Sequence, residues 1–495
     1  MHITPLAGLR FGINTPKKGL NRYKNKIFSD PCRLPLIALT VLFILLIKSD
    51  FQITHPKPQI TRLGLAERRA GGYNDPFEIL NLCTFPKNPA DNNLLKPMLT
   101  LDKFRQAANV LQNIILDTGL IYSKHFTQQT ENNVWLKPEN MQLTGAYKIR
   151  GALYKVASLS PAQRERGLIT ASAGNHAQGV GFAAQYYNAK ATIVMPETTP
   201  LVKVNNTKAY GVQVVLSGNI YDDAYAHAVQ LAQENNYEFV HPFNDLDIAA
   251  GQGTLAFEIL RALPETDIIL VPVGGGGLIA GVATLAKILK PEIKVIGVEP
   301  SGAACMKMSL KEGKITSLHL VETIADGVAV RTPGDIIFPY VQKFVDDIIT
   351  IDDKKLVDVF LDLMESHKMI VENAGLLPAA ALKYLDVKNK NVVALLSGGN
   401  MDVITISSLV QHGLRNRGRI FTFSVRLPDR PGELHRISGI IARERGNIIE
   451  LQHNQFVDIN RNSDKGTELV VTLEAFGHEH KNTIMTALSQ EGYAA

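Results

Sequence analysis

The chain has 495 residues, of which 45% are hydrophobic and 20% charged; this composition allows two or three globular domains and excludes a disordered or fibrous chain. Its formal net charge of +5 is concentrated in residues 1–97, which hold 14 Lys and Arg against 6 Asp and Glu, whereas the remainder, with 38 against 41, is slightly acidic. The basic balance therefore gives no support for a nucleic-acid partner. The three cysteines (Cys32, Cys83 and Cys305) form no zinc or disulfide pattern, which indicates a reducing compartment such as the cytoplasm.

Residues 1–97 form an N-terminal extension with little core-forming content. Its run Leu34–Ile47 has 14 consecutive residues without a charge, fewer than the roughly 20 that cross a bilayer, and no small-x-small cleavage motif follows it. Two interpretations remain open: a targeting or membrane extension, or a translation start at Met98 with the preceding segment lying upstream of it. We favour the second, because Met98–Leu101 leads directly into a helical pattern.

Between residues 98 and 412, short β-branched runs alternate with stretches of helical period. This alternation predicts an α/β domain with largely parallel sheets, in which binding sites form at the carboxyl ends of the strands. The expected strands are Ala191–Met195, Val212–Leu216, Glu238–His241, Asp267–Val273, Lys294–Val298, Asp346–Ile351 and Asn391–Leu396. The expected helices include Tyr221–Asn235, Leu278–Leu289, Lys354–His367 and Ala374–Leu385.

The motif Leu136–Ala152 reads LKPENMQLTGAYKIRGA and places Lys148 in the first turn of an expected helix. The positive end of the helix dipole disfavours a charged amine, and burial against Tyr147 would lower the pKa of Lys148 further. An uncharged amine is what Schiff-base chemistry requires. Taken alone, however, the motif favours a solvated surface lysine, because most lysines are of that kind.

A second motif, Ser172–Gly179, reads SAGNHAQG and follows the apolar run Leu168–Ala171. Its small residues let a ligand come close, the helix that opens here offers free N–H groups to a carboxylate, and Asn175 adds a side-chain donor and acceptor. An ordinary capped turn is the alternative, and His176 could equally be structural.

Four consecutive glycines, Gly274–Gly277, are followed by Leu278 and lie between an expected strand and helix. Because glycines carry a large conformational-entropy cost, the loop indicates backbone N–H groups that surround a phosphate. It lacks the acidic partner of a dinucleotide loop and the ending of an NTPase loop, so neither ligand is expected. Ser397, in the S-G-G-N turn after another expected strand, could reach a heterocyclic nitrogen; a plain turn is the alternative.

Together these motifs resemble the fold-type II pyridoxal-phosphate enzymes, and within them the threonine dehydratases (threonine ammonia-lyases). The resemblance implies a catalytic domain over residues 98–412 with two parallel-sheet subdomains. The stretches that carry it, in the family's order and spacing from Lys137 to Asn400, are KPENMQLTGAYKIRGA, SAGNHAQG, HPFND, AGQGT, VPVGGGGLIAG, GVEP, ADGVAV and SGGN.

The resemblance also implies the roles of individual residues. Lys148 is expected to hold pyridoxal 5'-phosphate covalently and to act as the catalytic base, with Tyr147 in a place that usually holds Phe. The other expected cofactor contacts are Asn175 at the phenolic oxygen, Ser397 at the pyridine nitrogen, and Gly274, Gly275, Gly276, Gly277 and Leu278 at the phosphate. The expected substrate contacts are Ser172, Ala173, Asn175 and His176.

The implied reaction is the dehydration and deamination of L-threonine to 2-oxobutanoate and ammonia, the first step of isoleucine biosynthesis, with L-serine as a weaker substrate. A serine dehydratase or serine racemase is the enzymatic alternative. The non-enzymatic alternative is an amino-acid sensor built on a catalytic domain that has lost its activity. Ala173 argues against racemisation, because eukaryotic serine racemases have a serine there. Their divalent-metal site has an aspartate where this chain has Cys305, so no metal is expected.

Residues 420–495 are expected to form a small domain after a basic stretch near 413–419. The βαββα order with a DRPGEL turn resembles an ACT domain, a ferredoxin-like α+β module that binds amino acids between paired copies; a module used only for assembly is the alternative. The resemblance implies isoleucine or valine as effector and a homotetramer or homodimer. The expected strands are Ile420–Leu427, Asn447–Val457 and Glu468–Glu474, with a last helix through about Gln490.

Overall fold

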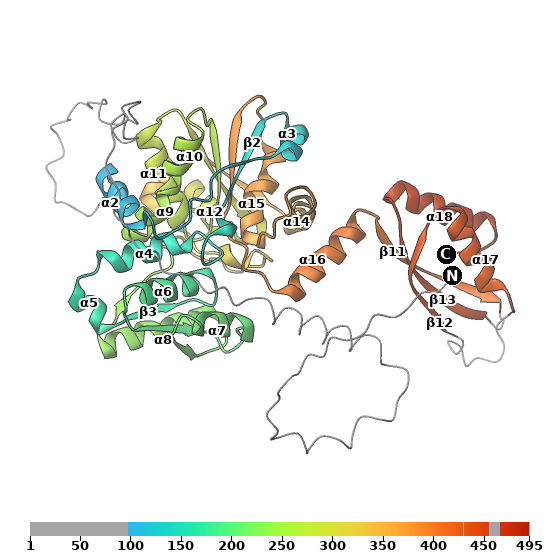
Figure 1. Ribbon diagram of the computed structural model, residues 1–495, viewed down its shortest axis with the longest axis horizontal. Helices are drawn as coiled ribbons and strands as arrows, with labels where there is room; N and C mark the ends of the chain where they lie inside the picture. The colour runs from blue at the N-terminus through green and yellow to red at the C-terminus, as the bar shows by residue number, and fades with distance from the viewer. Residues whose placement is uncertain (1–97, 429, 455–465, 495) are drawn as a thin grey trace, which may run out of the picture. The chain divides into compact units, whose positions relative to one another are not determined.

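The computed structural model describes residues 98–428, 430–454 and 466–494, which form three β-sheets with their surrounding helices (Figure 1). The N-terminal extension, including the apolar run 34–47, lies outside these residues. The helix expected after Met98 is confirmed as α2 (Leu101–Leu111), and it begins where the Thr100 side chain accepts a hydrogen bond from the Lys103 amide. None of the helices in the described part of the chain combines the length and apolar character of a membrane span.

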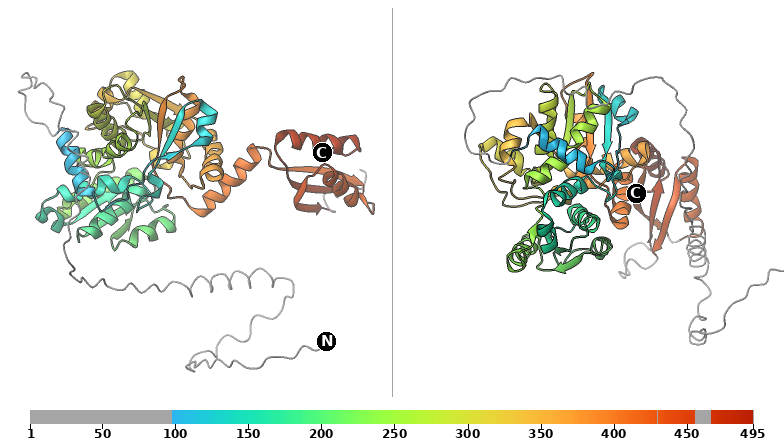
Figure 2. Two further views of the ribbon diagram at one scale, coloured as in Figure 1. Left: turned by 45° about the horizontal axis from the view of Figure 1, so that its top comes forward. Right: turned by 60° about the vertical axis from the view of Figure 1, so that its left-hand side comes forward.

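The larger subdomain is built on a sheet that is parallel except at its first edge strand, β1, which pairs antiparallel with β2. Strands far apart in the sequence lie side by side in it, and Figure 2 shows the cyan β2 next to strands of the later, yellow-to-orange part of the chain. The strand order is β1 (Ile121–Tyr122), β2 (Asn133–Pro138), β10 (Asn391–Leu396), β7 (Ile268–Pro272), β8 (Lys294–Pro300) and β9 (Asp347–Ile351).

The smaller subdomain has an all-parallel sheet of four strands, so the predicted pair of parallel-sheet subdomains is confirmed. The strand order is β5 (Gln213–Leu216), β4 (Ala191–Met195), β3 (Leu168–Ala171) and β6 (Glu238–Phe239). β6 is shorter than expected because the chain turns at His241, whose Nδ1 accepts hydrogen bonds from the amides of Phe243 and Asn244 at 3.2 and 2.8 Å.

Helices cover both sheets, and the four helices expected by range are present. The expected helix Ala374–Leu385 is divided: α15 ends at Ala381, and a 3₁₀ turn covers Leu382–Tyr384. In chain order the helices of this region are α2, α3 (Lys124–Thr130), α4 (Lys148–Ser158), α5 (Pro161–Arg166), α6 (Asn175–Tyr186), α7 (Leu201–Lys208), α8 (Tyr221–Asn235), α9 (Leu246–Gly253), α10 (Leu255–Ala262), α11 (Gly277–Leu289), α12 (Cys305–Glu312), α13 (Phe338–Phe344), α14 (Asp353–His367), α15 (Asn373–Ala381) and α16 (Val403–Asn416).

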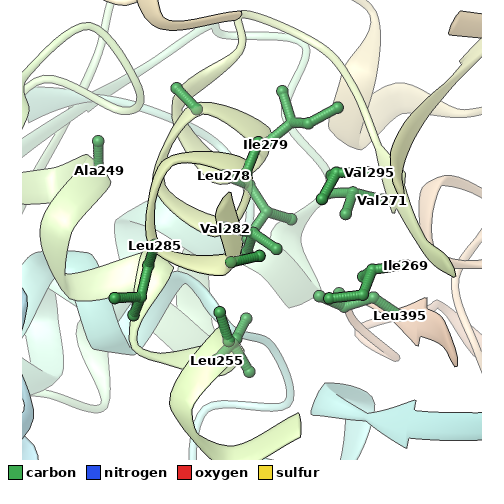
Figure 3. Close-up of a cluster of buried hydrophobic side chains, with 14 of the residues drawn as sticks. Ala249, Leu255, Ile269, Val271, Leu278, Ile279, Val282, Leu285, Val295 and Leu395 are labelled. Atoms are coloured by element: carbon green, nitrogen blue, oxygen red, sulfur yellow. The ribbon is translucent and has the colours of Figure 1, made fainter. Parts of the chain in front are cut away.

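Helix α11, which follows the glycine loop, is buried along most of its length. Figure 3 shows its side chains Leu278, Ile279 and Val282 directed towards Val271 of β7 and Val295 of β8, all of them nearly or fully buried. Each such side chain stabilises the fold by about 1.5–3 kcal/mol relative to its exposed state. The glycine loop is therefore held at a rigid edge of the larger sheet.

Helix α4, which begins at Lys148, is anchored by a buried cluster of four charged residues. Arg150 binds Glu139 through Nε at 2.8 Å and Glu258 through Nη1 at 2.5 Å, and Lys137 binds Glu258 at 2.5 Å. The side chains of Lys137, Glu139 and Arg150 are at most 1% exposed. Because two cations face two carboxylates, every buried charge has a partner.

The C-terminal domain has the expected βαββα order. Its antiparallel sheet runs β11-β13-β12, and the buried side chains of β11 (among them Phe423 and Val425) pack in one core with Ile437 and Ile484 of the two helices. Residues 455–457 of the expected second strand lie outside the described residues. The elements are β11 (Ile420–Pro428), α17 (Glu433–Arg443), β12 (Asn447–Asn454), β13 (Gly466–Glu474) and α18 (His478–Gln490).

The anchoring cluster predicts a large stability difference between two arginine substitutions. Arg150→Met should lower the free energy of unfolding by about 3–5 kcal/mol, because it leaves two buried carboxylates with one cation. Arg261→Met is the matched control: Arg261 binds Asp117 at 2.5 Å, but both side chains are more than half exposed, so its loss should cost less than about 1 kcal/mol. Urea unfolding followed by the fluorescence of Trp135, the chain's single tryptophan, measures both; equal losses would contradict the assignment.

Candidate active site

The candidate site is a cavity of about 1770 Å³ between the two subdomains. Loops that follow β3, β7 and β10 reach it, together with the start of α4. It brings together every site residue expected from the sequence: Tyr147, Lys148, Ser172, Ala173, Asn175, His176, Gly274, Gly275, Gly276, Gly277, Leu278 and Ser397 all line it. The predicted convergence of these motifs is therefore confirmed, whereas the role of each residue stays a prediction.

Lys148 is the first residue of α4, as predicted, and is not a solvated surface side chain. Its Nζ donates a hydrogen bond of 2.7 Å to the Pro242 carbonyl and lies 5.5 Å from the centre of the Tyr147 ring. Burial lowers the pKa of Lys148 to about 8, although the nearby Glu372 carboxylate works in the opposite direction. The amine therefore loses its proton far more readily than that of a solvated lysine.

Backbone hydrogen bonds join the Lys148 loop to the Ser397 loop. The Tyr147 amide donates to the Ser397 carbonyl at 3.1 Å, and the Gly399 amide donates to the Gly145 carbonyl at 2.9 Å. Gly145 has φ +70°, a conformation that glycine adopts without strain. The main chain at Lys148 and at Ser397 is thus held together by backbone hydrogen bonds, and both residues line the cavity.

The motif that contains Asn175 opens α6, with Gly174 as the residue before the helix. Asn175 Nδ2 donates to Glu372 Oε1 at 2.7 Å, and its Oδ1 accepts from Asn400 Nδ2 at 2.9 Å. Ser172 Oγ accepts from the Gly174 amide at 3.3 Å. Because the first N–H groups of a helix have no partner inside it, this end of α6 can receive an anion.

Close packing explains part of the glycine loop. A side chain at Gly275 would approach the Phe243 ring to 2.2 Å, and one at Gly277 would approach the Phe243 carbonyl to 2.6 Å. Gly276 has φ +100°, which a residue with a side chain rarely adopts. The loop is therefore both a tight contact with Phe243 and a row of amides at the start of α11, which suits a phosphate.

Three histidines line the cavity, and two of them, His176 and His241, are held neutral. Burial, with Lys148 nearby, lowers the pKa of His176 to about 3 and that of His241 to about 4. His176 Nε2 lies 2.9 Å from the Val240 carbonyl, so it carries the ring proton and donates it there. Neither ring is placed to supply a positive charge at neutral pH.

Glu372 is the functional candidate that sequence reasoning missed. It precedes α15 as its N-terminal cap residue, lines the cavity and is 7% exposed. Burial, and next the charge of Asp326, raise the pKa of Glu372 to about 7. The only sequence signal was a single acidic residue before an apolar helix, which does not by itself indicate a site.

The residues around Glu299 do not form a metal site in the described part of the chain. Each oxygen of Glu299 accepts a backbone amide at the start of α12, from Met306 and Lys307 at 2.9 Å. Burial raises the pKa of the Cys305 thiol to about 12, and a thiol binds metals as the thiolate. This donor set does not fit a divalent metal ion.

Comparison with known proteins gives consistent matches. Residues 111–398 match the family described as pyridoxal-phosphate dependent enzyme. A Thermotoga maritima protein named L-threonine ammonia-lyase is 41% identical over 398 residues, 80% of this chain and 98% of that protein.

Solved structures agree with the family match. The processed form of threonine deaminase isoform 2 from Solanum lycopersicum is 37% identical, with a TM-score of 0.60, over 63% of this chain and 93% of its own. Maize serine racemase is 33% identical, with a TM-score of 0.60, over 64% and 98%.

The lowered pKa of Lys148 can be tested in the cofactor-free protein. Acylation of Lys148 by an amine-selective reagent should reach half its maximal rate near pH 8, because only the neutral amine reacts. Glu372→Gln should move this midpoint further down, since the carboxylate favours the charged amine. Peptide mass spectrometry measures both; a midpoint near the ordinary lysine value of 10.5 would contradict the burial argument.

Proposed function

The chain belongs to the pyridoxal-phosphate dependent enzymes, and from this premise we propose that it is a threonine ammonia-lyase, which converts L-threonine to 2-oxobutanoate and ammonia. The observation that carries the proposal is the meeting of Lys148, the glycine loop Gly274–Gly277 and Ser397 in one cavity. The activity named for the T. maritima relative, which matches most of the chain, supports this choice of substrate.

The residues present fit the cofactor. Lys148 offers an amine with a lowered pKa, the amides at the start of α11 offer a phosphate site, and Ser397 offers a hydroxyl. Asn175 has one N–H left for a ring oxygen, because its other N–H is donated to Glu372. Bound there, pyridoxal phosphate supplies the electron sink that stabilises negative charge at the substrate's α-carbon.

Lys148 is the residue that moves the α-proton in this proposal. Once free, its amine accepts the α-proton of the substrate as a general base, which requires the neutral form that burial favours. Ser397 donates or accepts a hydrogen bond without enforcing a positive charge on the ring nitrogen, as an aspartate would. A weaker electron sink suits loss of the β-hydroxyl more than transamination.

Substrate binding is assigned to the opening of α6. Ser172, Ala173, Asn175 and His176 lie there in the cavity wall, and the helix amides face a carboxylate favourably. Ala173 bears no ionisable group, which removes the second acid that racemisation needs on the opposite face. A serine dehydratase or racemase remains the second candidate, favoured by the similarity to maize serine racemase.

The C-terminal domain is assigned as an ACT-type regulatory domain that binds isoleucine or valine. Its βαββα order supports this. The match to the T. maritima protein also supports it, because that match covers 398 residues and therefore extends beyond the catalytic range 111–398. β12 is an edge strand with Ile449 53% and Leu451 37% exposed, which suits pairing between copies in a homodimer or homotetramer.

We place the protein in isoleucine biosynthesis in the cytoplasm; Cys305, a buried free thiol, suits a reducing compartment.

The proposed reaction predicts 2-oxobutanoate from L-threonine with the purified, cofactor-loaded protein. Lys148→Ala should lower the rate by a factor of about 10³, the order expected when a general base is lost, and should abolish the visible absorption of the bound cofactor. kcat/KM should be higher for L-threonine than for L-serine, and a chiral assay should find no D-serine. A higher value for L-serine, or D-serine formation, would favour the second candidate.

Regulation predicts a shift in the threonine dependence. Isoleucine or valine should change the half-saturating threonine concentration at least about fivefold. Threonine should in turn change the effector's affinity in the same direction, because the coupling between two binding sites is reciprocal. D-Isoleucine serves as the stereochemical control. Kinetics and equilibrium binding that are both indifferent to the two L-amino acids would contradict the assignment while leaving the catalytic proposal intact.

A further inference from the structure

Glu372 has a place in the site that the proposed reaction does not use. Its Oε1 accepts the 2.7 Å hydrogen bond from Asn175, a residue 197 positions away in the sequence. Its own amide donates to the Gly398 carbonyl at 2.9 Å. One buried residue therefore contacts both the Asn175 loop and the turn that contains Ser397.

One motif glycine, Gly398, makes room for this carboxyl group. A Cβ on Gly398 would lie 2.4 Å from Glu372 Oε1 and 3.0 Å from Asn175 Nδ2, so any larger residue would displace the bonded pair. The glycine at 398 is thus explained by the contact between Glu372 and Asn175 and not by backbone conformation.

The orientation of the Asn175 amide follows from its partners. Asn400 Nδ2 donates to Asn175 Oδ1 at 2.9 Å and to the Thr144 carbonyl at 2.7 Å, which identifies Oδ1 as the acceptor side. Nδ2 then has two hydrogens, and Glu372 takes one of them. The remaining N–H lies in the cavity wall, and its direction is fixed by the other two bonds.

We propose that Glu372 is a positioning residue, which holds the Asn175 amide so that its second N–H meets the phenolic oxygen of pyridoxal phosphate. The proposal rests on the cofactor site described above and not on the identity of the substrate. Burial raises the pKa of Glu372 to about 7, and the charge of Asp326 adds to the rise. The hydrogen bond from Asn175, and after it the charges of Lys203 and Lys148, oppose it. In either protonation state one unprotonated oxygen remains to accept the Asn175 hydrogen bond.

A double-mutant cycle on cofactor affinity tests this role. Glu372→Ala and Asn175→Ala should each raise the dissociation constant of pyridoxal phosphate about tenfold or more, the order expected when a hydrogen bond to a charged group is lost. The double variant should bind no more weakly than Asn175→Ala alone, because Glu372 acts only through Asn175. Additive losses, or an unchanged affinity in Glu372→Ala, would overturn the proposal.

Conservative variants at Glu372 distinguish a role in positioning the Asn175 amide from a role in packing alone. Glu372→Gln keeps an acceptor oxygen and should retain most of the cofactor affinity and the position of the visible absorption band. Glu372→Leu, of similar volume, has no acceptor and should lose both. If Glu372→Ala does not fold, Glu372→Leu takes its place in the double-mutant cycle. Gly398→Ala should weaken cofactor binding as Glu372→Leu does. Loss of affinity in Glu372→Gln as large as in Glu372→Leu would overturn the proposal.

Asn373→Ala is the matched control within the same wall. Asn373 lines the cavity and is 7% exposed, but its Nδ2 donates to the Ile324 carbonyl at 2.9 Å and not to Asn175. Its effect on affinity should be small, and additive with that of Asn175→Ala. Since no threonine is present in these measurements, a wild-type protein that binds the cofactor but leaves threonine unchanged would sink the proposed function alone.

Discussion

The site depends on one junction of the main chain, where the loop before Lys148 is hydrogen-bonded to the turn that contains Ser397. The amide of Tyr147 and the carbonyl of Ser397 form one of its bonds, and Gly145 and Gly399 form another. Because these are backbone bonds at the carboxyl end of β10, the relative position of the main chain at Lys148 and at Ser397 is set by the sheet. A cofactor that contacts both groups therefore meets a preformed site.

The cost of this arrangement is a partly buried lysine, and the surrounding structure shows how the fold tolerates it. Burial lowers the pKa of Lys148 to about 8. Burial also raises the pKa of the neighbouring Glu372 to about 7, so both pKa values lie close to neutral pH. Two residues further along α4, the fully charged Arg150 is matched by carboxylates. Lys148 and Arg150 thus lie on one helix. Arg150 forms ion pairs with two carboxylates, whereas the Lys148 amine is hydrogen-bonded to a backbone carbonyl.

The fold and the convergence of motifs were predictable because they rest on local patterns. The strand ending at Leu396 and the four glycines from Gly274 each mark a strand, a turn and a helix start, which parallel topology brings to one edge. The partnership of Glu372 with Asn175 was not predictable, because it joins positions 197 apart. Nor did the sequence reveal that Gly275 makes room for the Phe243 ring, since that contact is created by the fold.

The most direct test of the account is to locate the cofactor covalently. Reduction of the loaded protein with borohydride fixes the bond between pyridoxal phosphate and an amine, and peptide mapping then identifies the modified residue. We expect one modified lysine, Lys148, and no stable modification in Lys148→Ala. Modification at a different lysine, or an unmodified wild-type protein that nevertheless deaminates threonine, would contradict it.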